Sequence, residues 1–295
     1  MTAWIAAFRL KTLPLALGAI LLGSRLHDST QDYTLEFELD IFLMASLTAI
    51  LLQILSNLAN DYGDFERGTD KHRTDRQLSS GKITPRAMLH AIIVFAVFSF
   101  ASGTYLLYIS FGSDWVNWIT FLGLGTASII AAVSYTMGKR AYGYHGLGDV
   151  FVFIFFGLVG VLGTAYLFKQ EITAVLCLPA IAYGALCVGV LNVNNIRDLD
   201  KDILTNKITI AAHLGLEGAL VYQIILMTIA FLGFTGHHIS EDYLSLAPIA
   251  MVILGFMHVR RLYNAEIADD YNEQLRLLSL GSLLVVVLFV IRLFY

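Results

Sequence analysis

Long apolar stretches recur along the whole chain, separated by short segments that carry nearly all of its charge. A helix of about 20 apolar residues crosses the hydrocarbon core of a bilayer, which is roughly 30 Å thick. Nine such stretches predict an all-α membrane protein with nine transmembrane helices, built as a single polytopic domain over residues 1–295. The predicted spans are residues 10–26, 39–59, 88–109, 116–137, 148–168, 172–194, 216–237, 243–262 and 275–294.

Composition supports this class. The chain is 57% hydrophobic and only 14% charged, and its mean hydropathy is +0.70. A soluble domain of this length would need far more polar surface to cover its core, so the soluble class is excluded. Gly157, Gly160 and Gly163 recur every third residue in one predicted span, a pattern typical of close helix packing in membranes.

Positive charge is distributed unevenly over the predicted loops. With a cytoplasmic N-terminus, loops 60–87, 138–147, 195–215 and 263–274 face the cytoplasm as well. Of the 19 Lys and Arg residues, only Arg25, Lys169 and Arg292 then lie outside. Cytoplasmic loops concentrate positive charge, so the sequence predicts a cytoplasmic N-terminus. Because the basic residues fit this topology, nucleic-acid binding has no support, and no obligate protein partner is indicated.

Two acidic motifs stand where even-numbered spans end. The first loop opens with "NDYGDFERGTD", residues 60–70, and the third with "NVNNIRDLDKD", residues 192–202. If the helices continue into these loops, four pairs at i and i+4 share faces. Asp64 and Asp198 lie 134 positions apart with four spans between them, as expected of two pseudo-repeated four-helix units followed by a ninth helix. The pairs are Asn57 with Asp61, Asn60 with Asp64, Asn194 with Asp198, and Asp198 with Asp202.

Carboxylates so close together repel one another and take up protons unless a counter-charge keeps them ionised. Oxygen-rich clusters of Asp and Asn suit Mg²⁺, which completes its shell with water and phosphate oxygens. Two facing clusters could therefore hold a diphosphate through Mg²⁺, while basic side chains neutralise the remaining phosphate charge. The basic candidates are Arg67, Lys71, Arg73, Arg76, Arg197, Lys201 and Lys207.

Several of these residues have a second interpretation. Glu66, Asp75 and Asp200 fit equally well as solvated loop charges. Four Asn residues in or next to the motifs could instead bond neighbouring helices through their amides: Asn57, Asn60, Asn194 and Asn195.

The motifs resemble those of the intramembrane aromatic prenyltransferase superfamily of the UbiA type. That family carries an Asn- and Asp-rich motif after its second span and an Asp-x-x-x-Asp motif after its sixth. "RQLSSGKIT", residues 76–84, and "SYTMGKRAYGYHGLGD", residues 134–149, also resemble its loops. The resemblance extends over nearly the whole chain. Within the family, the motifs and the run "GDVFVFIFFG" most resemble the branch that prenylates 1,4-dihydroxy-2-naphthoate in menaquinone biosynthesis.

The resemblance implies a UbiA-type helical bundle in the cytoplasmic (inner) membrane, with an active site that faces the cytoplasm. The implied reaction is Mg²⁺-dependent transfer from polyprenyl diphosphate to 1,4-dihydroxy-2-naphthoate with decarboxylation, giving demethylmenaquinol, while the prenyl tail lies among the spans near membrane lipid. The implied metal ligands are Asp61, Asp64, Asp70, Asp198 and Asp202. All of these except Asp70 are also assigned catalytic roles, together with Tyr135. The implied substrate-binding residues are Asn57, Asn60, Arg67, Lys71, Arg76, Lys139, Asn194, Asn195, Arg197, Lys201, Lys207, Tyr142 and Asp149.

Three of these assignments have alternatives. The ring of Tyr135 or Tyr142 could face an allylic cation, but anchoring at the membrane interface is the commoner role of Tyr. Asp149 could bind metal or orient a base, and it fits equally well as a helix N-cap.

Other functions remain open at this point. Another aromatic acceptor, 4-hydroxybenzoate or homogentisate, would suit the same motifs. An ion-coupled transporter also uses intramembrane carboxylates, but it predicts them near the middle of a span. A phosphatidyl-type transferase uses Asp and Mg²⁺ in one contiguous motif, whereas this chain has two separate ones.

Overall fold

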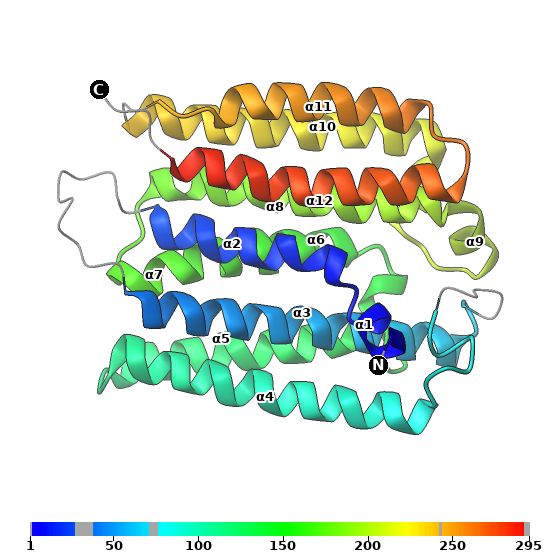
Figure 1. Cartoon of the computed structure of the whole chain (residues 1–295), viewed down its shortest axis with the longest axis horizontal. Coiled ribbons are helices and arrows are strands. Elements are labelled where there is room, and N and C mark those ends of the chain that lie inside the picture. Colours follow the sequence, from blue (N-terminus) through cyan, green and yellow to red (C-terminus); the bar gives the residue numbers. More distant parts are fainter. Residues whose placement is uncertain (1, 27–37, 71–75, 242–243, 292–295) are drawn as a thin grey trace.

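The computed structural model describes residues 2–26, 38–70, 76–241 and 244–291, and its long helices lie roughly along one axis (Figure 1). Apart from one isolated bridge between His145 and Ile208, the regular structure of these residues is helical, so the all-α prediction is confirmed. The principal helices are α1 (Thr2–Ala7), α2 (Leu13–Arg25), α3 (Leu39–Arg67), α4 (Pro85–Phe111), α5 (Trp115–Ser134), α6 (Gly148–Val152), α7 (Thr164–Lys169), α8 (Cys177–Arg197), α9 (Leu199–Leu204), α10 (Ile210–Glu241), α11 (Ala247–Tyr263) and α12 (Ala268–Val290). The shorter elements are η1 (Leu10–Thr12), η2 (Tyr142–Tyr144), η3 (Phe153–Gly163) and η4 (Ala174–Leu176).

Eight helical segments in the described part of the chain are long and apolar enough to cross a membrane. They coincide with eight of the predicted spans. The remaining predicted span, 243–262, corresponds to α11, which is helical but only 17 residues long. The count of nine transmembrane helices and the division into two four-helix units therefore stay predictions.

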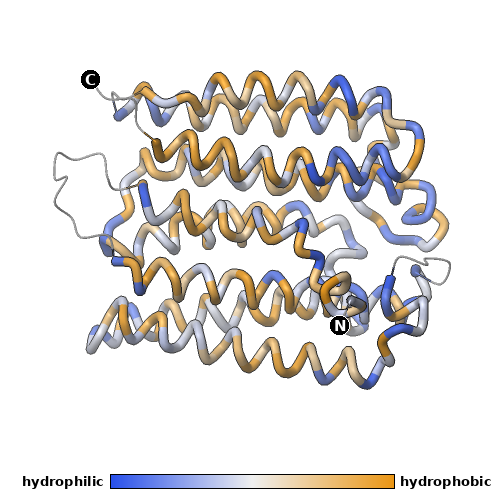
Figure 2. Tube along the Cα trace, in the orientation of Figure 1, coloured by the Kyte–Doolittle hydropathy of each residue, from blue (hydrophilic) through white to orange (hydrophobic). Residues whose placement is uncertain are grey.

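Most of the hydrophilic residues gather at one end of the bundle, on the right in Figure 2, and fewer lie at the other end. The first motif, α9, the α5–α6 loop and the α11–α12 turn all lie at this end, which Figure 1 shows on the right. These are the segments for which the Lys and Arg distribution predicted a common side. The end that they share is called the polar end below.

Helix α8 is the most enclosed helix of the bundle. In its most apolar stretch 67% of the residues are buried, compared with 6% in α5. Small residues allow neighbouring backbones to approach α8: a Cβ added at Gly157 of η3 would lie 2.7 Å from the carbonyl oxygen of Ala180. The Tyr183 hydroxyl also donates to the carbonyl of Leu15, 2.7 Å away, and so ties α8 to α2. The central position of α8 fixes where the second acidic motif leaves the bundle.

The span that contains the three regularly spaced glycines is continuous from Gly148 to Lys169, but its middle part, η3, is a π-helix. The expected close helix packing is found at Gly157 and at Gly160. A Cβ added at Gly160 would lie 3.1 Å from Cβ of Ala19. The expectation is wrong for Gly163, where the nearest atom would be 3.9 Å away.

Candidate active site at the polar end

The first acidic motif forms the last turns of α3, as the i, i+4 spacing predicted. Helix α3 ends at Gly68, which has φ of 74°, a left-handed conformation that glycine adopts readily. After this reversal the Thr69 backbone N–H and hydroxyl both donate to the carbonyl of Asp64. Asp70, only 1% exposed, is thereby turned back toward the bundle.

The second motif spans a break between α8 and α9. Asp198 ends α8 and precedes α9, with φ −96° and ψ 9°. Its backbone N–H still donates to Asn194, 3.2 Å away, and its carbonyl accepts from Asp202 at 2.8 Å. The i, i+4 spacing therefore persists through the break. The chain turns so that Asp202 is buried, whereas Asp200 is exposed.

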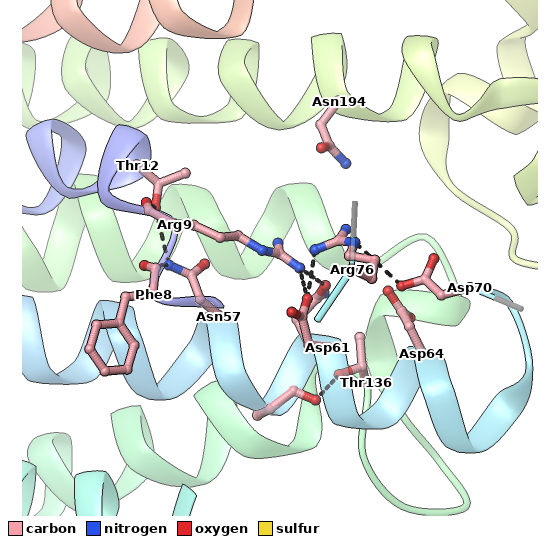
Figure 3. Close-up of polar contacts among 12 residues, drawn as sticks. Phe8, Arg9, Thr12, Asn57, Asp61, Asp64, Asp70, Arg76, Thr136 and Asn194 are labelled. Carbon is pink, nitrogen blue, oxygen red and sulfur yellow. Dashed lines mark hydrogen bonds and ion pairs between the residues drawn. The ribbon is translucent and has the colours of Figure 1, made fainter. Parts of the chain in front are cut away.

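Ion pairs bring the two motifs together. Lys201 Nζ of α9 pairs with one carboxylate oxygen of Asp70, and Arg76 Nε lies 3.4 Å from the other. The Arg76 guanidinium also donates to Asp61 at 2.6 Å. Arg9, from the segment between α1 and η1, reaches the same oxygen of Asp61 and donates to Asn60 Oδ1 at 2.9 Å. In Figure 3 the two guanidinium groups converge on Asp61, and Asn194 points toward them from α8.

A second cationic cluster lies beside Asp64. The Tyr144 hydroxyl donates to Asp64 Oδ1 at 2.6 Å, and two cations lie over the Tyr144 ring, Arg67 at 4.2 Å and Lys207 at 5.6 Å from its centroid. Lys207 Nζ lies 3.6 Å from Asp202. This arrangement depends on the α5–α6 loop, because the Ile208 N–H donates to the Tyr144 carbonyl at 3.2 Å.

Burial and charge shift the proton affinities of this cluster. Burial raises the pKa of Asp202 to about 6, against the lowering effect of Lys207, and Asp198 adds to the rise. Burial lowers the pKa of Lys207, but the carboxylates of Asp64 and Asp202 outweigh it, so the net pKa is raised and Lys207 stays charged. Burial also raises the pKa of Tyr135 to about 12. The cluster therefore holds a permanent cation beside a carboxylate that titrates near neutrality.

A cavity of about 770 Å³ opens at this cluster and extends between the helices. Its wall at the polar end carries carboxylates, amides and cations, and the rest of the wall is predominantly apolar. Such a cavity suits a molecule with a charged head and a long hydrocarbon tail. The polar wall includes Arg9, Asn57, Asn60, Asp61, Asp64, Arg76, Asn194, Arg197, Asp198, Lys201 and Lys207.

Aromatic rings line the passage from the polar wall into the apolar part. Tyr135 packs edge-on against Tyr142 with ring centroids 5.3 Å apart, and Tyr142 stacks on Phe151 at 4.0 Å. Phe155 follows at 6.0 Å, and all four residues line the cavity. The ring faces can stabilise a cation that develops near the carboxylates.

The other predicted site residues lie outside the cavity wall. Asp70, Asp202, Asn195 and Asp149 are buried behind it, while Arg67 and Lys139 are exposed. Lys71 lies outside the described residues, as do Arg73 and Asp75. Glu66 and Asp200 are exposed, which favours the interpretation of both as solvated charges.

Two predicted residues of α3, Asn57 and Asp61, contact the N-terminal segment. Asn57 Nδ2 donates to the Phe8 carbonyl at 3.0 Å and to Thr12 Oγ1 at 3.1 Å, so its amide joins α3 to the N-terminal segment. Asp61 Oδ1 pairs with the guanidinium groups of both Arg9 and Arg76. Its contacts make it a charge anchor for Arg9 and Arg76.

The sequence did not single out Arg9 or Tyr144. In the sequence, Arg9 stands out only as a positive charge before the first span, and Tyr144 only as part of a loop that resembles the family's. Thr136 was also missed: its hydroxyl donates to the Ala59 carbonyl at 2.9 Å and holds the α5–α6 loop against α3. The one signal in the sequence was the density of Tyr in "SYTMGKRAYGY".

The donor set fits Mg²⁺, which prefers oxygen ligands. Asp202 Oδ2 and Asn195 Oδ1 are buried oxygens without a hydrogen-bond partner. In the described part of the chain, no three His, Cys, Asp or Glu side chains lie close enough to hold a metal ion by themselves. This arrangement suits an ion that takes its remaining ligands from phosphate oxygens and water.

Sequence comparison identifies the family, since residues 12–289 match the UbiA prenyltransferase family. The chain belongs to this family. It is an integral membrane protein and an aromatic prenyltransferase. The 1,4-dihydroxy-2-naphthoate octaprenyltransferase of Haemophilus influenzae is 37% identical over 97% of this chain and 94% of its own. The Escherichia coli enzyme of the same name is 42% identical over 76% of this chain and 72% of its own.

Solved structures show the same fold for this UbiA-family chain. A UbiA homologue from Aeropyrum pernix, without ligand, superposes with a TM-score of 0.68 at 17% identity, covering 96% of both chains. A homologue from Archaeoglobus fulgidus bound to DMAPP and Mg²⁺ gives a TM-score of 0.63 at 14% identity, covering 97% of this chain and 99% of its own.

Proposed function

We propose that this enzyme transfers a polyprenyl group from polyprenyl diphosphate to 1,4-dihydroxy-2-naphthoate, with loss of CO₂, to give demethylmenaquinol. The observation that carries the proposal is the meeting of two acidic motifs at the polar wall of a largely apolar cavity. The names of the relatives from Haemophilus influenzae and Escherichia coli support the acceptor.

The diphosphate would lie at the polar wall, between Asn194 and the guanidinium groups of Arg9 and Arg76. Lys201 and Lys207 line the same wall and would bind its remaining charge. Asp64, Asp198 and Asp202 would hold Mg²⁺, with Asp70 behind them. Bound Mg²⁺ would neutralise the charge that develops on the leaving diphosphate.

The reaction breaks the bond between C1 of the prenyl group and the diphosphate oxygen, and the electron pair leaves with the diphosphate. Cations fixed before the reaction stabilise this charge without reorganising. The rings of Tyr135 and Tyr142 face the allylic cation that remains. The naphthoate ring then bonds to C1, and its carboxylate leaves as CO₂.

The cavity also accounts for a membrane location of the chemistry. Its apolar part would hold the prenyl tail beside lipid, while its polar end admits the anionic head. We infer that the polar end faces the cytoplasm of the inner membrane, because the segments predicted to be cytoplasmic all lie there.

The test uses the purified full chain with octaprenyl diphosphate, 1,4-dihydroxy-2-naphthoate and Mg²⁺, with the product identified by mass spectrometry. Asp64→Asn and Asp198→Asn should each lower kcat/KM by at least about a hundredfold, because each removes a charged ligand of the diphosphate complex. Glu66→Gln and Asp200→Asn are matched controls, since both acids are exposed on the same two loops.

Parallel reactions with 4-hydroxybenzoate and homogentisate test the acceptor. Preferred transfer to either one would overturn the naphthoate assignment. Full activity of both Asn variants would overturn the assignment of the site.

A further inference from the structure

Three glycines line the apolar part of the cavity from three different helical elements: Gly103 of α4, Gly125 of α5 and Gly163 at the end of η3. Helix packing does not require glycine at these positions. A Cβ added at Gly125 would meet no atom within 4 Å, and one at Gly163 would lie 3.9 Å from the Phe121 ring. A Cβ at Gly103 would lie 3.7 Å from Thr48. A Cβ would therefore stand in open space at Gly125 and make ordinary van der Waals contact at Gly163 and Gly103.

Other glycines of the same region behave differently. Gly160 also lines the cavity, but a Cβ there would lie 3.1 Å from Cβ of Ala19 on α2, so glycine at this position serves close helix packing. Glycine in a helix interior costs about 1 kcal/mol relative to alanine. At Gly103 and Gly125 this cost is not offset by any close approach of another backbone. What the missing side chains provide at these positions is volume inside the cavity.

The three glycines lie far from the charged end. Thr48, the neighbour of Gly103, precedes Asp61 by 13 residues on α3, which corresponds to roughly 20 Å at 1.5 Å per residue. Beyond this level the helices close on one another: Phe121, the neighbour of Gly163, packs on Phe111 and stacks on Tyr166. A diphosphate bound at the polar wall would therefore bring only the distal isoprene units of its tail to these glycines.

We propose that Gly125 and Gly163, with Gly103 opposite Thr48, determine the length of prenyl donor that the enzyme accepts. The volume that they leave open admits the distal units of a long tail, and a side chain at either position fills that volume. The first isoprene units, near Tyr135 and Phe151, do not reach them. This inference rests on the proposed prenyl transfer and adds which residues select among its donors.

The test compares Gly125→Leu and Gly163→Leu with Gly123→Leu. Gly123 is a matched control: it lies two residues from Gly125 and hence on the opposite face of α5. An added Cβ there also meets nothing within 4 Å, and Gly123 does not line the cavity. Each variant, purified as the full chain, is assayed with geranyl diphosphate and with octaprenyl diphosphate as donors.

In both cavity variants the kcat/KM ratio of the eight-unit to the two-unit donor should fall by at least about tenfold, the usual effect of overfilling a packed apolar site. Geranyl transfer should stay within about threefold of wild type, and Gly123→Leu should leave the ratio unchanged. An unchanged ratio in both cavity variants, or equal loss of both donors in a variant that still unfolds cooperatively, overturns the inference.

Displacement of a bound fluorescent prenyl diphosphate by each donor separates this inference from the proposed function. If wild type binds neither donor, the proposed prenyl transfer fails. If wild type binds both and the cavity variants bind the eight-unit donor equally well, only the length selection fails. Gly103→Val provides a third cavity variant in case one of the leucine variants does not fold.

Discussion

Lys201 of the second acidic motif pairs with Asp70 of the first, although they are 131 positions apart in the chain. Asp70 is 1% exposed and also lies 3.4 Å from Arg76, so its charge is shared between the two loops. The Lys201 side chain is 30% exposed and lines the cavity. The pair therefore joins the motifs at the wall where the diphosphate would bind.

Lys201→Ala should raise the KM for the donor by about tenfold, because it removes a cation and leaves Asp70 with Arg76 alone. Asp70→Asn should cost less in the Lys201→Ala background than in wild type, with a coupling energy of about 1–3 kcal/mol in a double-mutant cycle. Lys139→Ala is the control, since Lys139 is exposed and does not line the cavity. Strict additivity of the two substitutions would show that the pair has no role in binding.

Arg9→Gln should lower kcat/KM by about 10- to 100-fold, since hydrogen bonds to charged groups contribute about 1.5–3 kcal/mol each. Arg9→Lys should recover part of the loss, because both contacts, to Asn60 and to Asp61, come from the single nitrogen Nη2, which a lysine ammonium replaces in charge but not in reach. Steady-state kinetics measure both variants. Wild-type kinetics in Arg9→Gln would contradict the role, and Arg260→Gln, at the end of α11, serves as the distant control.

Tyr144→Phe should lower kcat/KM by about tenfold, because the lost hydroxyl donates to Asp64 at 2.6 Å. The ring that contacts Arg67 and Lys207 is retained, so thermal stability should change little. Titration of activity with Mg²⁺ should show a higher requirement, since Asp64 loses the group that orients it. An unchanged Mg²⁺ requirement would mean that this hydrogen bond does not orient a ligand.

The helices and both acidic motifs could be predicted from the sequence because their signals are local. Apolar runs long enough to span a bilayer are unambiguous, and i, i+4 spacing places Asn60 and Asp64 on one face whatever the tertiary fold. The break at Asp198 was not predicted, yet the same spacing persists through it.

Other parts of the site depend on packing, which the sequence does not reveal. Arg9 contacts Asp61 while its own backbone has a φ of 51°. This conformation is uncommon for a residue other than glycine, so the surrounding structure must stabilise it. Tyr144 contacts Asp64 because hydrogen bonds fix the α5–α6 loop: the Ile208 N–H donates to the Tyr144 carbonyl, and the Thr136 hydroxyl donates to the Ala59 carbonyl of α3. Asp61 is predicted as a metal ligand from its type and spacing, but the sequence does not reveal that guanidinium groups from two distant segments pair with its Oδ1.

Asp202 should make stability depend on pH. Its pKa is raised by burial from 3.8 to about 6, so the folded state binds this proton more tightly than the unfolded state does. The stabilisation that protonated Asp202 gives to the folded state is fully present below about pH 4 and is lost as pH rises through 6. The free energy of unfolding changes by up to about 3 kcal/mol over this range. Because Asn does not titrate, Asp202→Asn should gain stability relative to wild type between pH 4 and about pH 7, measured by thermal unfolding without Mg²⁺.

Lys207 keeps its proton over this range, so it adds no pH dependence of its own to that comparison. Added Mg²⁺ should stabilise wild type more at about pH 7 than at about pH 5, since metal ligands must be deprotonated. A wild-type response to Mg²⁺ that is the same at both values would exclude Asp202 as a ligand.

Gly63→Ala should destabilise the site although Gly63 has no side chain that could contact a substrate or a metal ion. A Cβ at this position would lie 2.5 Å from the Thr136 carbonyl oxygen, so α3 and the α5–α6 loop would have to separate. That loop carries Tyr144, and separation would weaken its bond to Asp64. We expect a loss of about 1–3 kcal/mol in unfolding free energy and a lower kcat. Gly255→Ala, where a Cβ meets nothing within 4 Å, should be neutral or slightly stabilising. Equal stability of the two variants would mean that the close approach of α3 to Thr136 does not position the loop.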